Sequence, residues 1–101
     1  MTRTKDVELV HLDDCPLWLG AAERLRQAMR RAGIDPASLR DRSVATEDAP
    51  ADFPGSPTIL IDGRDPFAGA TPVGPACRRY STEHGLDFAP SPEQLVEVLT
   101  R

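Results

Sequence analysis

Two cysteine thiols are the residues of this sequence best suited to chemistry. Cys15 stands in "HLDDCPLW", where a hydrophobic run stops and a helical pattern starts, and Cys77 follows a proline-rich stretch. A thiol at the start of a helix lies beside unpaired N–H groups and the positive end of the helix dipole, which favour the thiolate. Asp13 and Asp14 oppose this effect if their carboxylates lie near the sulfur. We therefore predict that Cys15 is a nucleophile, with Cys77 as a distant second catalytic thiol if the fold brings the two together.

The elements that must position Cys15 are predicted from the hydrophobic pattern. Residues 7–12 form a nearly continuous apolar run, which is typical of a strand buried on both faces. Residues 15–32 place apolar side chains at three- and four-residue steps, which predicts a long helix. Asp14 is its expected N-cap and Gly33 its expected C′ residue. Residues 57–63 predict a strand that ends in an Asp-Gly turn.

Weaker signals complete the order of elements. Residues 42–46 predict a short second strand, and residues 77–80 the start of another with "TEHG" as its turn. "SPEQLVEVLT" predicts a final helix, because Ser91 and Gln94 have the spacing of a capping box. A strand–helix–strand order implies a parallel pair of strands. We therefore expect residues 1–101 to form one α/β domain with a mixed sheet of about four strands, a long first helix and a C-terminal helix.

The order of these motifs resembles the thioredoxin superfamily. In that family a first strand leads to a C-x-x-C motif at the start of a helix, and here the corresponding letters, beginning at Cys15, are C-P-L-W. A second likeness is "GSPTILIDG", because the family carries a cis-proline just before its third strand, a position that Pro57 fits. The resemblance implies a thioredoxin-like sandwich in which the helix before the cis-proline is reduced or absent.

The resemblance also implies a site around one thiol. Cys15 would be the nucleophile, and the backbone beside the cis-proline would be an edge on which a substrate chain docks. The implied binding residues are Pro16, Trp18, Ser56, Pro57 and Thr58. Trp18 takes the place of the resolving cysteine, so a dithiol cycle within the motif is impossible. His11 lies within the first strand and is expected to pack there, since a lone histidine is weak evidence of acid–base chemistry.

Three functions are compatible with these residues. The first is thiol–disulfide exchange, or reduction of a mixed disulfide, through Cys15, with a protein or small-molecule thiol or disulfide as partner. The second is a non-catalytic thioredoxin-fold module whose groove binds a peptide or protein and in which the cysteine is incidental. The third is a soft-metal or organomercury site formed by Cys15 and Cys77, because thiolates prefer soft metals.

The composition limits the partners and the compartment. The formal net charge is −4, which disfavours nucleic acid because proteins that bind phosphate backbones are usually basic. The first apolar run is too short for a signal sequence or a membrane span, so we expect a cytoplasmic protein with no membrane partner. Two cysteines are too few for a disulfide scaffold. Since no C-x-x-C or H-x-x-H spacing is present, no cofactor and no zinc-type metal site are expected.

Overall fold

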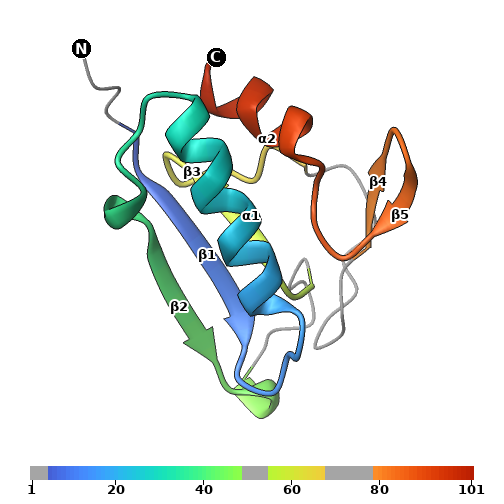
Figure 1. Cartoon of the computed structure of the whole chain (residues 1–101). Coiled ribbons are helices and arrows are strands. Elements are labelled where there is room, and N and C mark those ends of the chain that lie inside the picture. Colours follow the sequence, from blue (N-terminus) through green and yellow to red (C-terminus); the bar gives the residue numbers. More distant parts are fainter. Residues whose placement is uncertain (1–4, 49–54, 68–78) are drawn as a thin grey trace.

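The structure is a computed structural model that describes residues 5–48, 55–67 and 79–101 of the chain. In these ranges it is a small mixed α/β structure with two α-helices, a three-stranded sheet and a two-stranded sheet (Figure 1). The elements, in chain order, are β1 (Val7–Leu12), α1 (Trp18–Arg31), the 3-10 helix η1 (Pro36–Ser38), β2 (Arg40–Val44), the 3-10 helix η2 (Thr46–Asp48), β3 (Thr58–Ile61), β4 (Tyr80–Thr82), β5 (Gly85–Asp87) and α2 (Pro92–Leu99).

The strand β1 is the centre of the three-stranded sheet, whose order is β2-β1-β3. It runs parallel to β2 and antiparallel to β3, with Val10 opposite both Arg42 and Thr58. Because α1 connects β1 to β2, the predicted strand–helix–strand unit is confirmed. Hydrogen-bonded neighbours on both sides explain why β1 has a nearly continuous apolar sequence, with five of its six residues buried.

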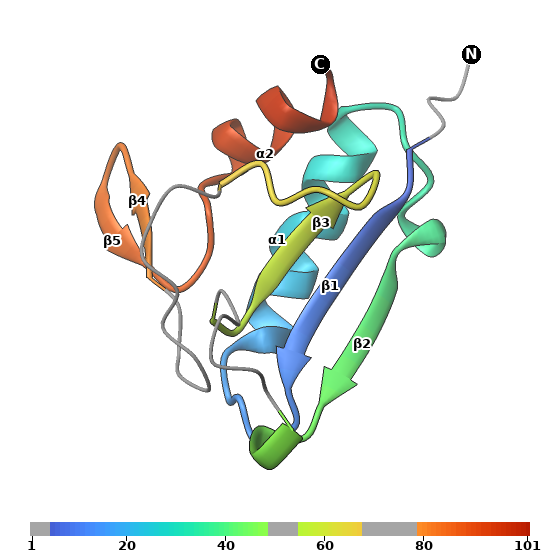
Figure 2. The same ribbon diagram turned by 180° about the vertical axis from the view of Figure 1, so that it is seen from behind.

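Both helices cover the same face of this sheet. The helix α1 lies across the sheet and α2 packs against α1, whereas the opposite face of the sheet is turned toward the viewer in Figure 2. The buried stripe of α1 follows the three- and four-residue spacing expected of it. The stripe consists of Ala21, Ala22, Leu25, Ala28 and Met29. All of these side chains except that of Ala21 join those of α2, β1 and β3 in the main core. Neither described helix has the length and apolar character needed to cross a membrane.

The C-terminal end of α1 confirms the prediction for Gly33. Gly33 has a φ of +79°, and its N–H donates to the carbonyl oxygen of Arg30 at 3.2 Å. The N–H of Ile34 donates to the carbonyl oxygen of Met29 at 2.8 Å, which completes a Schellman motif. This motif needs a left-handed residue at C′, and glycine adopts that conformation without the steric penalty of a Cβ atom.

The N-terminal end of α1 differs from the prediction. The helix begins at Trp18 with Leu17 as N-cap, and no side chain hydrogen-bonds to the cap. Asp14, the predicted cap, instead accepts a hydrogen bond from the hydroxyl of Thr46 at 2.9 Å. Two short turns separate β1 from α1, since the chain must change direction before the helix can cross the sheet. Cys15 therefore lies before the helix and not in its first turn.

The hairpin of β4 and β5 is a sheet of its own. The predicted strand near residues 77–80 exists as β4 from Tyr80 onward, but among the described residues it does not join the sheet of β1. In the part of the chain that the structure describes, the mixed sheet around β1 therefore has three strands, where about four were expected. Side-chain hydrogen bonds attach the hairpin to α1. The guanidinium of Arg24 donates to the carboxylate of Asp87 at 3.2 Å and to the carbonyl oxygen of Pro90 at 3.1 Å.

Two further predictions concern the connections. Between β2 and β3 the described residues contain only η2, with residues 49–54 outside the description, so no full helix is seen before Pro57. The start of α2 is confirmed as a capping box. Ser91 accepts from the N–H of Gln94 at 3.1 Å, and the Gln94 side chain accepts from the N–H of Ser91 at 2.9 Å.

Candidate thiol site

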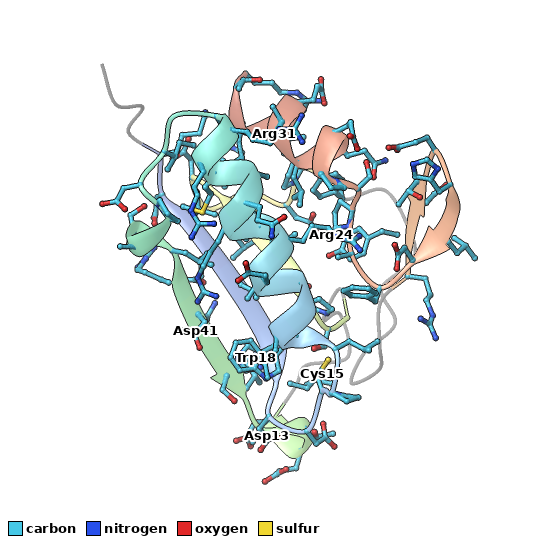
Figure 3. The ribbon with its side chains drawn as sticks, viewed as in Figure 1. Asp13, Cys15, Trp18, Arg24, Arg31 and Asp41 are labelled. Carbon is cyan, nitrogen blue, oxygen red and sulfur yellow. The ribbon has the colours of Figure 1, made fainter. Side chains whose placement is uncertain are left out.

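Cys15 lies in the loop between β1 and α1 and is almost fully buried. Only 6% of the residue is exposed, and it clusters with Val10 and Leu12 of β1. The half-buried side chains of Leu17 and Trp18 pack against this cluster. Cys15 is a free cysteine, and its sulfur lies near the beginning of α1 (Figure 3). The predicted nucleophile is therefore a shielded thiol beside the first turn of the helix.

The segment predicted to contain a cis-proline does contain one. The Ser56–Pro57 peptide bond is cis, and Ser56 is completely buried. The hydroxyl oxygen of Ser56 accepts a hydrogen bond from the N–H of Leu12 at 3.0 Å. Because 44 residues separate these two positions in the chain, this bond is a tertiary link between the end of β1 and the cis-proline segment.

The backbone of Leu12 connects the parts of the site. Its carbonyl oxygen accepts from the N–H of Cys15 at 3.1 Å and also lies 3.1 Å from Nδ1 of His11. A carbonyl oxygen can only accept, so Nδ1 carries the imidazole proton in this contact. With the bond to Ser56, one residue of β1 thus holds the thiol loop, the imidazole and the cis-proline segment together.

Trp18 and His11 form a parallel stack above the end of β1. Their ring centroids are 4.0 Å apart and the rings are inclined by only 2°. His11 is 4% exposed, as expected of a packed histidine, and its Nε2 is buried without a hydrogen bond. The nearest carboxylate is that of Asp41, with 3.8 Å between Nε2 and the oxygen. The stack fixes the indole beside the cluster that contains Cys15.

Asp41 had no signal of its own in the sequence. It lies on β2 opposite Leu9, which places its side chain on the same face of the sheet as His11. The register of the parallel strands β1 and β2 brings the Asp41 carboxylate near the His11 imidazole. This contact could not be predicted before that register was known.

The two aspartates that could oppose a thiolate are engaged elsewhere. The hydroxyl of Thr46, in η2, donates to Asp14 at 2.9 Å and lies 3.3 Å from Asp13. Figure 3 shows Asp13 beside η2, whereas the sulfur of Cys15 lies closer to α1. In addition, the first turn of α1 contains no acidic residue and its N-cap makes no side-chain bond. The positive end of the helix dipole is therefore not neutralised by a capping side chain.

The remaining predicted binding residues have defined positions. Pro16 is exposed in the thiol loop. The carbonyl oxygen of Pro57 accepts from the hydroxyl of Tyr80 at 2.6 Å. The hydroxyl of Thr58 donates to the carbonyl oxygen of Gly55. The hydroxyl of Thr58 therefore stabilises the turn around the cis bond, and Tyr80 is a member of this site that the sequence did not reveal.

Cys77 lies outside the described residues, so its pairing with Cys15 in a redox or soft-metal site stays a prediction. Among the described residues, no group of three or more His, Cys, Asp and Glu side chains is arranged to hold a metal ion. Comparisons of the chain with protein-family models, curated proteins and solved structures found no match.

Proposed function

We propose that this protein is a thioredoxin-like thiol protein that exchanges disulfides through Cys15. The observation that carries the proposal is the hydrogen-bonding of Leu12, which links the Cys15 loop to the buried Ser56 at a cis-proline. The start of α1 supports the proposal, because the sulfur of Cys15 lies near it and neither an acidic residue nor a side-chain cap occupies that end of the helix. The position of Asp13 supports it further, because this side chain lies beside η2 whereas the sulfur of Cys15 lies closer to α1 (Figure 3).

The exchange has two steps in this proposal. The Cys15 thiolate attacks one sulfur of a disulfide, forms a mixed disulfide and releases the other half as a thiolate, which takes up a proton from water. Because Trp18 replaces the usual resolving cysteine, a second thiol from solution then attacks the mixed disulfide. This attack regenerates the Cys15 thiolate and leaves the oxidised partner as a new disulfide.

This exchange requires that a disulfide can reach the sulfur of Cys15. With 6% of Cys15 exposed, Leu17 or Trp18 must move before a disulfide can approach the sulfur. Neither side chain is fully buried, and the thiol loop has no side-chain cap on its helical end. A local opening of this loop requires less disruption than unfolding of the core.

The decisive experiment treats the folded protein with glutathione disulfide at pH 7 and identifies the modified cysteine by mass spectrometry. We expect a mixed disulfide at Cys15 in the wild type and in Cys77→Ser, and none at that position in Cys15→Ser. Added reduced glutathione should remove the modification. If Cys15 reacts only in urea, with the native protein unmodified, exchange through this residue is wrong.

A second candidate function is supported by the burial of Cys15. A shielded thiol without a resolving partner suits a module that binds an extended peptide beside Ser56 and Pro57, with the cysteine as a packing residue. The same experiment separates the two functions, because only the binding module keeps its native thiol unreactive. Peptides selected from a displayed library on Cys15→Ser should then bind the wild type with equal affinity.

A further inference from the structure

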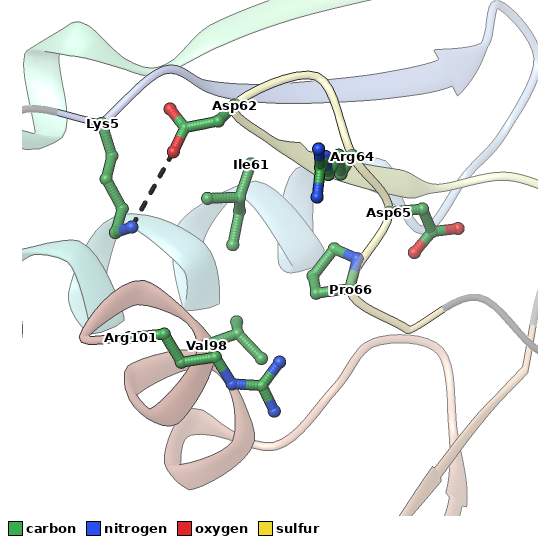
Figure 4. A pocket seen from close by; sticks show the side chains of 8 residues that line it. All are labelled: Lys5, Ile61, Asp62, Arg64, Asp65, Pro66, Val98 and Arg101. Atoms are coloured by element: carbon green, nitrogen blue, oxygen red, sulfur yellow. Dashed lines mark ion pairs between the residues drawn. The ribbon is translucent and has the colours of Figure 1, made fainter.

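A cavity lies at the end of the sheet opposite the thiol loop. Cys15 follows the last residue of β1, whereas this cavity is bounded by Lys5, just before β1, by Ile61 at the end of β3 and by Val98 of α2. Its volume is about 530 Å³, within the range of small-molecule sites. Figure 4 shows the lining side chains from close by.

A tight turn creates the wall of this cavity. Asp62 and Gly63 have φ values of +53° and +79°, as a type I′ turn requires. The N–H of Ile61 donates to the carbonyl oxygen of Arg64 at 2.8 Å, and the N–H of Arg64 donates back at 3.1 Å. The turn reverses the chain after β3 and places Arg64 and Pro66 on the cavity wall.

The charges around the cavity are unevenly paired. Three cationic side chains line it, those of Lys5, Arg64 and Arg101, together with the carboxylates of Asp62 and Asp65. Lys5 pairs with Asp62 at 3.8 Å, and Arg101 pairs with Glu97 at 3.1 Å. The guanidinium of Arg64 has no ion pair or hydrogen bond with any other described residue. Among the described lining residues it is therefore the cation that has no partner, and its planar fork suits a carboxylate.

The remaining lining is apolar. Ile61 is 8% exposed and Val98 is 5% exposed, so each contributes the edge of a core side chain to the floor. Pro66 adds a third apolar surface. A ligand that fills the cavity therefore gains from an apolar body as well as from its charge.

We propose that this cavity binds a small monocarboxylate with an apolar body, such as an arylacetate or a short fatty acid. The carboxylate pairs with Arg64 and the apolar body covers Ile61, Val98 and Pro66. A dianion is disfavoured because Asp62 and Asp65 line the same cavity. The proposal is independent of the function proposed for Cys15, since no residue is shared.

The test is an NMR titration of the full chain with phenylacetate, using acetate, 2-phenylethylamine and inorganic phosphate as comparison probes. We expect saturable amide shifts at Ile61, Gly63 and Val98 with a millimolar Kd. Acetate and phosphate should bind more weakly because they lack the apolar body. The amine should not bind because its charge is positive. Equal binding of phosphate or of the amine would overturn the proposal.

Two variants with the same change of charge complete the test. Arg64→Gln should weaken phenylacetate binding about tenfold. Arg42→Gln serves as the control, because Arg42 lies on β2 in an ion pair with Glu8 and does not line the cavity. It should leave the Kd within about twofold of the wild type. If Arg64→Gln binds phenylacetate as tightly as Arg42→Gln does, Arg64 is an ordinary solvated arginine and the site is wrong.

Discussion

At the scale of single residues, the backbone of Leu12 is the centre of the thiol site. Its N–H is bound by Ser56, and its carbonyl oxygen by Cys15 and His11. A buried backbone N–H without a partner is destabilising, so the Ser56 hydroxyl is needed as an acceptor. The arrangement around Cys15 therefore depends on the hydroxyl of Ser56, which comes from a segment far along the chain.

Ser56→Ala tests this dependence. The variant leaves the N–H of Leu12 without its acceptor, and we expect a loss of about 1–3 kcal/mol in the free energy of unfolding. Alkylation of Cys15 by iodoacetamide should become faster, because the loop is held less firmly. Urea denaturation and the alkylation rate measure the two effects. Ser38→Ala, at an exposed hydroxyl in η1, is the control, and equal stability of both variants would show that the Ser56 bond contributes nothing.

At the scale of elements, the β4–β5 hairpin is attached to α1 through one arginine. Arg24 bonds Asp87 and the carbonyl oxygens of Ala89 and Pro90, and its guanidinium lies 4.7 Å from the centroid of the Phe88 ring. The Asp87 carboxylate accepts a hydrogen bond from the N–H of Phe88, which lowers the pKa of this carboxyl below its ordinary 3.8. The hydrogen bond from Arg24 lowers the same pKa to a smaller extent. The contact between Arg24 and the Asp87 carboxylate should therefore weaken when this carboxylate is protonated at low pH.

The sign of this acid sensitivity follows from linkage. Because the pKa of Asp87 is lower in the folded chain, the carboxylate stabilises the fold above about 3.8, and this stabilisation is lost as the pH falls through the lowered value. We therefore expect Asp87→Asn to be less stable than the wild type at pH 7, and the difference to shrink toward pH 3. Urea denaturation across this range measures it. Asp48→Asn, at an exposed position of η2, is the control, and a difference that grows toward low pH would refute the sign.

At the scale of the whole molecule, one core joins the elements that carry the thiol loop and the cavity beside Arg64. The main cluster joins β1 and β3 to both helices, with Leu25 of α1 completely buried within it. The thiol loop follows β1 at one end of the sheet, and the cavity beside Arg64 lies at the other end. A change in the core should therefore affect the stability on which both sites depend.

Leu25→Ala and Leu19→Ala compare the two faces of α1 with the same substitution. Leu25 is 0% exposed, and its truncation should lower the free energy of unfolding by about 2–5 kcal/mol. Leu19 is 64% exposed, and the same change there should stay within about 0.5 kcal/mol. Urea denaturation followed by circular dichroism gives both values. Similar losses in the two variants would mean that α1 is not packed on the sheet as described.

The local elements were predictable because their signals lie within a few residues of one another. The periodic stripe of α1, the capping box of Ser91 and Gln94, and the positive-φ turn at Gly63 depend on backbone geometry and short-range hydrogen bonds. The cis bond before Pro57 was inferred from a family resemblance and is present in the structure. The start of α1 was misplaced, because the hydroxyl that engages Asp14 comes from Thr46 in a distant segment.

The sequence by itself therefore determined the α/β class, the central buried strand and the place of Cys15 between that strand and the first helix. Only the tertiary structure decided what surrounds them. The bond from Leu12 to Ser56, the stack of His11 on Trp18 and the separation of the β4–β5 hairpin from the main sheet all join or divide segments far apart in the chain. Such contacts depend on strand register and packing, which no local pattern of residues encodes.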